Sequence, residues 1–213
     1  MTTTNRTSHP IALRDATVTD PFWASRQELV RTQVIPYQWN ALNIYEGRID
    51  MATVVDVAAY ILKRCGAMTT MKLQKLAFYS QAESLARRGH PLFDEDFQAW
   101  RGGPVCRELY AQHRGKFLIR EGELPVNDCE KTLSEEEKQT IDAVCAVLSS
   151  RTGNELSIRT HAESPWKIAR GDLPPSAPCS TIISKKTIQE YYAANPIVRE
   201  SMQKQVPTPN TFI

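Results

Sequence analysis

Residues 89–110 read GHPLFDEDFQAWRGGPVCRELY and join two segments with helical periodicity. The stretch contains the only Gly-Gly-Pro of the chain, at positions 102–104. Glycine reaches backbone angles closed to other residues, and proline has no N–H to lose at the first position of a helix. Val105, Leu109 and Tyr110 then recur at helical spacing. We therefore predict a tight turn lined by aromatic residues, followed by a helix over 104–114.

Helical patterns precede this turn. Residues 51–65 and 69–88 are predicted to form a helical hairpin, with Gly66 and Gly89 as the C-terminal stops. An apolar stripe runs along the second helix through Leu73, Leu76, Ala77, Ser80 and Leu85. The basic residues of that helix are placed mostly off the stripe; they are Lys72, Lys75, Arg87 and Arg88.

Helical patterns also follow the turn. Ser134 and Glu137 form a capping box for a helix that reaches about residue 150. Shorter helices are predicted over 154–158, from Ser164 onward and after Ser184, while 115–133 is predicted as loop or short extended pieces. The fold class is therefore mainly α: an irregular bundle of about six to eight helices, with or without a small strand pair.

Composition narrows the class of protein. The chain has 213 residues and is 41% hydrophobic and 23% charged, which fits a soluble globular protein. Its net charge of +2 gives no electrostatic argument for binding to nucleic acid or to a membrane. No apolar run reaches the roughly 18–20 residues of a membrane span, and MTTTNRTSHP lacks the apolar core of a signal peptide. Five widely spaced cysteines favour reduced thiols. A cytoplasmic location is expected.

Three segments are expected along the chain: an N-terminal extension at 1–50, a helical domain at 51–195 and a tail at 196–213. Within the extension, residues 15–43 resemble the opening of bacterial β-L-arabinofuranosidases, but the barrel and catalytic residues of those enzymes have no counterpart. A coincidental helix-turn-helix is the alternative. Because the domain pattern begins at Met51, residues 1–50 are interpreted as a fusion remnant or the product of an upstream mis-start.

One pair of residues could carry acid–base chemistry. His161 and Glu163 flank Ala162, just before Pro165 and Trp166. No nucleophile motif accompanies them, so the preferred interpretation is that Thr160 and His161 bind helix ends while Trp166 packs in the core. We assign no catalytic, cofactor-binding or metal-binding residue.

Two metal sites and one pocket are less favoured alternatives. A zinc site would lack the close ligand pairs of structural zinc sites; its candidates are Cys106, His113, Cys129 and His161. A divalent-cation site would use acids that more often cap a helix or face solvent; these are Glu83, Asp94, Glu95 and Asp96. A small-ligand pocket would use aromatic residues that more often pack in a core; these are Tyr79, Trp100 and Tyr110.

Basic residues are concentrated between positions 63 and 114. They are Lys63, Arg64, Lys72, Lys75, Arg87, Arg88, Arg101, Arg107 and Arg114. Ordinary solvated faces are the preferred interpretation. If these side chains share one surface, it could bind an acidic partner or nucleic acid.

Two segments together resemble the Panacea domain, the SocA-like antitoxin domain of bacteria and phages that also occurs in phage-associated GepA-type proteins. They are KLQKLAFYSQAESLARRGHPLFDEDFQAWRGGPV at 72–105 and THAESPWKIA at 160–169, and the resemblance extends over about 51–194. The signature positions of this resemblance are Lys72, Leu73, Lys75, Leu76, Trp100, Gly103, Pro104, Val105, Tyr110, Thr160, His161, Pro165 and Trp166.

The resemblance implies an interaction protein and not an enzyme. It implies an antitoxin that binds a cognate toxin, in some cases as an adaptor that delivers the toxin to a cytoplasmic protease, with no cofactor, no membrane and no nucleic acid as expected partner. The alternatives are a DNA-binding regulator that uses the basic 63–114 surface and a small hydrolase or metal enzyme that uses His161 and Glu163. Partner contacts need exposed aromatic or arginine anchors; the candidates are Arg101, Arg107, Tyr191 and Tyr192.

Overall fold

The fold is built around one helix, α4 (Thr70–Arg88), in which every residue from Leu73 to Leu85 is buried. The computed structural model describes residues 52–126, 129–174 and 176–198, so the predictions for 1–50 and for the last residues of the tail lie outside it. The side chain of Thr69 accepts a hydrogen bond from the N–H of Lys72 at the start of α4, and Gly89 ends it in the left-handed conformation. Both ends agree with the prediction.

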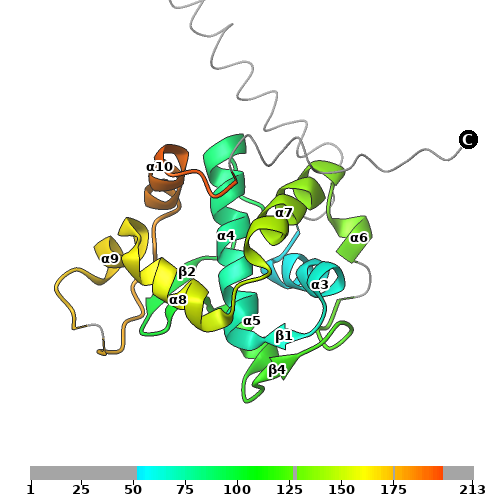
Figure 1. Cartoon of the computed structure of the whole chain (residues 1–213), viewed down its shortest axis with the longest axis horizontal. Coiled ribbons are helices and arrows are strands. Elements are labelled where there is room, and N and C mark those ends of the chain that lie inside the picture. Colours follow the sequence, from blue (N-terminus) through cyan, green and yellow to red (C-terminus); the bar gives the residue numbers. More distant parts are fainter. Residues whose placement is uncertain (1–51, 127–128, 175, 199–213) are drawn as a thin grey trace, which may run out of the picture. The chain divides into compact units, whose positions relative to one another are not determined.

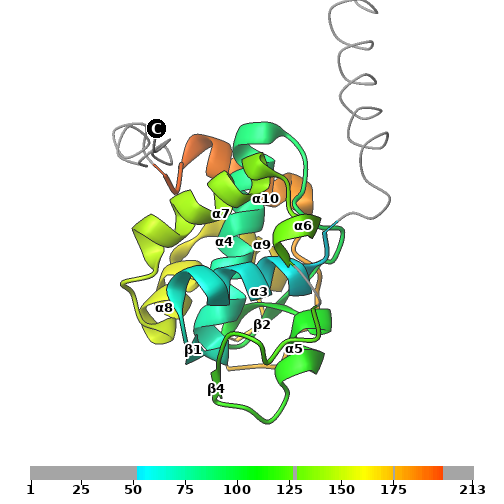
Figure 2. The same ribbon diagram turned by 90° about the vertical axis from the view of Figure 1, so that its right-hand side faces the viewer.

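A helix that is buried on all sides needs neighbours on all sides. Four helices pack against α4: α3 (Val54–Cys65), α7 (Glu135–Leu148), α8 (Gly153–Ala162) and α10 (Lys185–Ala194). Figures 1 and 2 show them arranged around it. Three shorter helices complete the described α-structure: α5 (Arg107–His113), α6 (Cys129–Thr132) and α9 (Ser164–Arg170). The mainly α prediction is confirmed.

Capping boxes fix where three of these helices begin. Thr53 with Asp56 starts α3, and the predicted pair Ser134 with Glu137 starts α7. The helix predicted over 154–158, with Asn154 as its cap, has the wrong bounds: Thr152 caps α8 together with Glu155, and α8 runs on to Ala162. The Thr-x-x-Glu spacing at 152–155 is also that of a capping box, so the sequence contained the signal that predicts this helix start.

Two small antiparallel strand pairs accompany the helices. Strand β1 (Met68–Thr69) pairs with β4 (Leu118–Ile119), and β2 (Phe97–Trp100) pairs with β3 (Gly103–Cys106). The predicted helix over 104–114 is therefore wrong in its first part, because residues 103–106 pair with β2 and the helix begins only at Arg107. Pairing with β2 in a tight hairpin outweighs the preference of proline for a helix start.

The β2–β3 hairpin has neighbours along both edges. On the β2 side, the N–H of Ala99 donates to Thr181 O at 2.9 Å, and the N–H of Ile183 donates to Phe97 O at 2.8 Å. On the β3 side, side chains of α4 replace a strand. Gln74 accepts from the N–H of Cys106 at 2.9 Å and donates to its carbonyl at 3.2 Å.

Lys75 completes this edge by donating to Pro104 O at 3.0 Å. The prediction that Lys75 lies off the buried face of the helix is wrong, because Lys75 is only 1% exposed. A buried backbone carbonyl needs a donor, and the lysine supplies one. Gln81, six residues further along α4, binds the loop before the hairpin in a similar way: it accepts from Leu92 N at 2.7 Å and donates to Phe93 O at 2.8 Å.

Candidate functional site

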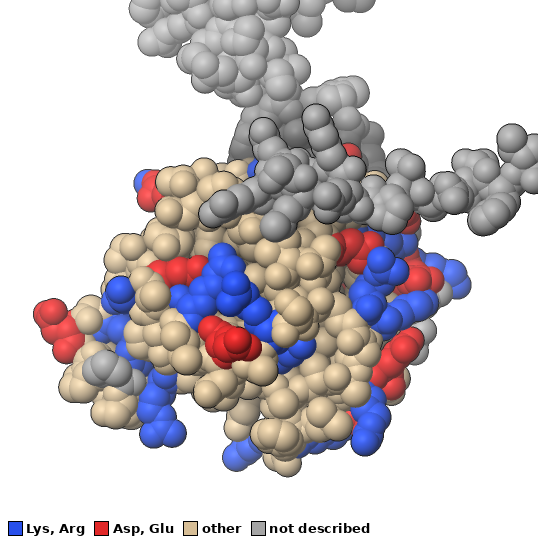
Figure 3. Space-filling model, in the orientation of Figure 1, with Lys and Arg blue, Asp and Glu red and all other residues tan. Residues whose placement is uncertain are grey.

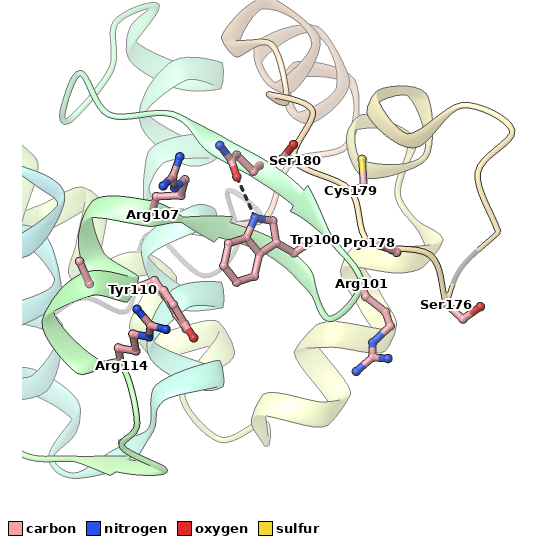
Figure 4. Close-up of a pocket in the computed structure, with 11 residues that line it drawn as sticks. Trp100, Arg101, Arg107, Tyr110, Arg114, Ser176, Pro178, Cys179 and Ser180 are labelled. Carbon is pink, nitrogen blue, oxygen red and sulfur yellow. Dashed lines mark hydrogen bonds between the residues drawn. The ribbon is translucent and has the colours of Figure 1, made fainter.

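An open cavity of about 840 Å³ lies between the hairpin, α5 and the loop that leads to α10 (Figure 4). We call it the arginine groove. The residues that line it are Gln98, Trp100, Arg101, Arg107, Tyr110, Ala111, Arg114, Ser176, Pro178, Cys179 and Ser180. All of them belong to the described residues, and none of them is acidic.

The periodicities of a strand and of a helix explain which side chains line the groove. Along β2, Phe97 and Ala99 are buried while Gln98 and Trp100 are half-buried, so the outer face of the strand belongs to the groove. In α5 the lining residues stand at 107, 110, 111 and 114, the spacing of one helix face. Residues 176–180 form the opposite wall.

Two aromatic side chains lie at the centre of the groove. The rings of Trp100 and Tyr110 meet edge to face, with centroids 5.1 Å apart and planes at 61°. The indole N–H of Trp100 donates to Gln98 Oε1 at 2.8 Å, as the dashed line in Figure 4 shows. Because its donor is already satisfied within the chain, Trp100 offers apolar ring surface to a ligand.

Three exposed arginines surround this aromatic pair. Arg107 and Arg114 come from the α5 wall, and Arg101 from the turn between β2 and β3 (Figure 4). None of the three forms an ion pair with any residue that the structure describes. Their guanidinium groups therefore remain available for bidentate contacts with an anion.

The other basic residues of the 63–114 region do not extend this site. Four of them pair with acids: Lys63 with Glu130, Arg64 with Asp142, Arg87 with Glu83 and Arg88 with Glu136. Lys72 donates to Ser149 O, and Lys75 is buried. On the face in Figure 3, basic and acidic side chains are interspersed. Among the described basic residues of the 63–114 region, the three arginines of the groove are therefore the ones that form a local cluster.

The proposed acid–base pair is divided between two environments. Glu163, 8% exposed, accepts from the hydroxyls of Tyr79 at 2.9 Å and Tyr192 at 2.5 Å, and from Arg159 Nε at 3.0 Å. His161 stacks on Trp166 with centroids 4.1 Å apart.

Burial lowers the pKa of His161, and the charges of Lys75 and Arg170 act in the same direction. The surroundings of His161 thus disfavour its protonated form, while the Glu163 carboxylate is occupied by structural hydrogen bonds. This arrangement is that of a packed core and not of a nucleophile–base–acid relay.

The predicted metal ligands also have other partners. Glu95 accepts from the N–H of Val54, Asp96 pairs with Lys185, and Glu83 with Arg87. Of the zinc candidates, His113 contacts Gln74, and the Cys106 thiol donates to Glu108. Within the part of the chain that the structure describes, no three His, Cys, Asp or Glu side chains are grouped to hold a metal ion.

The predicted partner-binding residues fall in two places. Arg101 and Arg107 lie in the arginine groove, as do Trp100 and Tyr110, whereas Tyr79 of the proposed pocket is buried in the core. Tyr192 is 1% exposed, which contradicts its expected role as a surface anchor. Tyr191 is half-buried and packs on Tyr192. Arg114 was named among the basic residues of the 63–114 region but not among the predicted anchors, although its spacing from Arg107 is that of one helix face. The 176–180 wall was not predicted.

The signature positions of the family resemblance meet at the hairpin. Lys75 lies against Gly103, as does the hydroxyl of Thr160, and the Trp166 indole donates to Trp100 O at 2.9 Å. Leu73, Leu76, Pro104 and Pro165 are buried, Val105 is half-buried, and Lys72 binds the end of α7 through Ser149. These positions hold α4, the hairpin, α8 and α9 together, and Trp100 and Tyr110 alone among them line the groove.

Comparison with known proteins supports this resemblance. The family model described as "Antitoxin SocA-like, Panacea domain" matches residues 73–167, which confirms the Panacea resemblance over that range. Neither a curated protein nor a solved structure matches the chain. Among the described helices, none combines the length and the apolar character that crossing a membrane requires. The matched range contains α4, the hairpin and α5, and so two of the three parts of the groove.

Proposed function

We propose that this chain is a cytoplasmic antitoxin that neutralises a cognate bacterial or phage toxin by direct, stoichiometric binding through the arginine groove. The family match supports an antitoxin-like role. The observation that carries the binding site is the open cavity in which three arginines, without an ion pair to any described residue, surround the edge-packed Trp100 and Tyr110. Protein interfaces depend most on buried aromatic and arginine side chains, and this groove presents both.

The groove is also suited to binding because little has to change when a partner arrives. Trp100 is held by Gln98 and by Tyr110, so the aromatic centre is already ordered. The arginines have no acidic partner among the described residues to give up. Preorganised groups lose less entropy on association, which leaves more of the contact energy for affinity.

The two alternatives have less support. A hydrolase would need His161 and Glu163 to cooperate, and Glu163 already accepts three hydrogen bonds from structural partners. A DNA-binding regulator would need a basic surface that follows a phosphate backbone, and the basic residues beyond the groove are largely paired or buried. Delivery of the toxin to a protease is a possible extension of the binding role.

Co-expression with the toxin encoded beside the antitoxin tests the proposal. The wild-type chain is expected to form a complex that survives size-exclusion chromatography and to restore growth. The double variant Arg107→Glu/Arg114→Glu should lose both, since these exposed side chains contribute little to folding. Arg151→Glu is the matched control: an exposed arginine without an ion pair among the described residues, outside the groove. A double variant that is folded and still binds and rescues would disprove this use of the groove.

Two further arms separate mechanisms. Rescue at clearly substoichiometric antitoxin that disappears in folded His161→Gln would indicate an enzyme. Substoichiometric rescue that disappears in a host without the protease would indicate an adaptor.

A further inference from the structure

We propose that the arginine groove binds an acidic peptide segment of the partner in an extended conformation, with its carboxylates on the arginines and an apolar side chain on Trp100 and Tyr110. This inference rests on the proposed function and specifies the chemistry of the toxin segment. It follows from the charge, the spacing and the extent of the groove.

Charge identifies the anion. Arg101, Arg107 and Arg114 are exposed, and no acidic side chain lines the cavity beside them. The guanidinium group presents a planar pair of N–H donors that matches a carboxylate. Three such groups around one cavity repel each other until an anion is bound, so an acidic ligand relieves an unfavourable arrangement as well as making new contacts.

Spacing identifies the arrangement of the acids. Arg107 and Arg114 stand seven residues apart on one face of α5 and at its end, so their backbones are separated by about 10 Å along the helix axis. An extended peptide advances about 3.3 Å per residue. Successive side chains of an extended peptide alternate between two faces, so two acids that face the same wall stand an even number of positions apart. Acids four positions apart span about 13 Å, which the long arginine side chains bridge, and the residue midway between them faces the aromatic pair.

The aromatic centre identifies what stands between the acids. The indole N–H of Trp100 is used by Gln98, so the groove floor offers ring surface and no free indole donor. An apolar or aromatic side chain removes that surface from water when it binds. A purely acidic segment would leave it exposed.

The extent of the groove favours a peptide over a nucleic-acid strand. Single-stranded nucleic acid is bound along grooves whose positive charge follows the backbone for several nucleotides. Neither Arg64 nor Arg88 lines the groove, and they are paired with Asp142 and Glu136, so they do not extend its positive charge into such a track. A cavity of about 840 Å³ is within the usual range for a ligand of a few residues.

Cys179 provides a probe on the opposite wall. It is half-buried, lines the groove and is a free thiol. Burial disfavours its thiolate, but hydrogen bonds with Thr181 and the charge of Arg170 together hold its pKa below the usual value. Cys65, also a half-buried free thiol, lies on α3 and outside the groove, so it serves as an internal control for alkylation.

The test uses the full-length chain and the peptide acetyl-GEAFAEAFAEG-amide carrying a fluorophore, with the Glu-to-Gln peptide and an eight-residue oligothymidine as matched probes. Fluorescence anisotropy should show binding of the acidic peptide that weakens with added salt. Binding should be at least about tenfold weaker for the Gln peptide and for the Arg107→Glu/Arg114→Glu protein, and unchanged for Arg151→Glu. Bound peptide should slow iodoacetamide labelling of Cys179 and leave that of Cys65 unchanged.

Several results would overturn the inference: equal binding of the acidic and Gln peptides, tighter binding of the oligothymidine, absence of peptide binding, or binding without protection of Cys179. Comparison with the toxin complex separates this inference from the proposed function. A toxin that binds through the arginines while the acidic peptide does not bind would refute the peptide chemistry alone. Peptide binding without a toxin complex would support the groove chemistry and refute the antitoxin role.

Discussion

Lys75 lies directly against Gly103: a β-carbon added to Gly103 would stand 2.7 Å from Cε and 2.9 Å from Nζ of the lysine. Gly103 also has φ = 98°, which side chains rarely tolerate. The ammonium group uses the space that the missing side chain leaves, and from there it donates to Pro104 O. Helix α4 and the hairpin are locked together at this point.

Gly103→Ala should lower the free energy of unfolding by about 2–4 kcal/mol, because strain at positive φ adds to a clash that Lys75 cannot avoid without losing its carbonyl acceptor. Gly102→Ala is the neighbouring control, since a β-carbon there meets no atom within 4 Å. Urea denaturation compares the two. Equal midpoints would show that the contact does not determine stability.

Lys75 should make stability depend on pH. Burial lowers the pKa of Lys75 from 10.5 to about 7. Between those values the unfolded chain holds a proton that the folded chain has released, so raising the pH favours folding, by up to about 1.4 kcal/mol per pH unit. Relative to Lys75→Met, the wild-type protein should therefore gain stability from about pH 7 to pH 10. A difference that stays constant over this range would mean that Lys75 remains charged in the fold.

Trp100→Ala should separate binding from folding. Trp100 is only half-buried, so its removal should cost clearly less stability than the roughly 3–5 kcal/mol expected for a fully buried ring, while binding of the toxin should be lost. Phe97→Ala, three positions earlier on the buried face of the same strand, should show the full loss of stability. Thermal melting and co-purification measure the two effects. Retained toxin binding by folded Trp100→Ala would argue against the aromatic centre.

Glu163 should be a structural residue. Glu163→Ala leaves two tyrosine hydroxyls and Arg159 without their acceptor, and should destabilise the fold by about 2–4 kcal/mol. Tyr79→Phe removes one donor and should cost about 1 kcal/mol. Chemical denaturation of both variants provides the comparison. A stable Glu163→Ala protein that no longer protects cells would instead reopen a catalytic role.

Cys65 should react with alkylating agents at lower pH than an ordinary thiol. A hydrogen bond with the thiol of Cys145 lowers the pKa of Cys65 more than burial raises it, and Lys72 and Arg64 add to the effect. In Cys145→Ala the pH at which Cys65 becomes reactive should shift upward. Mass-spectrometric rates of iodoacetamide labelling give the profile; identical profiles in the two proteins would remove Cys145 as the cause.

Local patterns predicted the elements whose signals are local. The caps of α4 and the Ser134 box appear in the sequence at their correct places because a helix end is formed by residues within four positions of each other. The strand at Gly103–Cys106 was mispredicted because it depends on pairing with 97–100, which the preference of proline for a helix start does not reveal. The burial of Lys75 was mispredicted because its acceptor, Pro104 O, lies 29 positions away in the sequence. Arg107 and Tyr110 of the groove were identifiable, whereas the 176–180 wall is defined only by where the chain returns to β2.

The coverage of both hairpin edges limits how other chains can approach. Residues 181–183 lie along β2, and Gln74 and Lys75 bind the outward groups of Pro104 and Cys106 in β3. No unpaired main-chain ladder remains there to template a neighbouring strand. The hairpin can therefore present its arginines and aromatic rings to solvent without offering a free strand edge to a neighbouring chain.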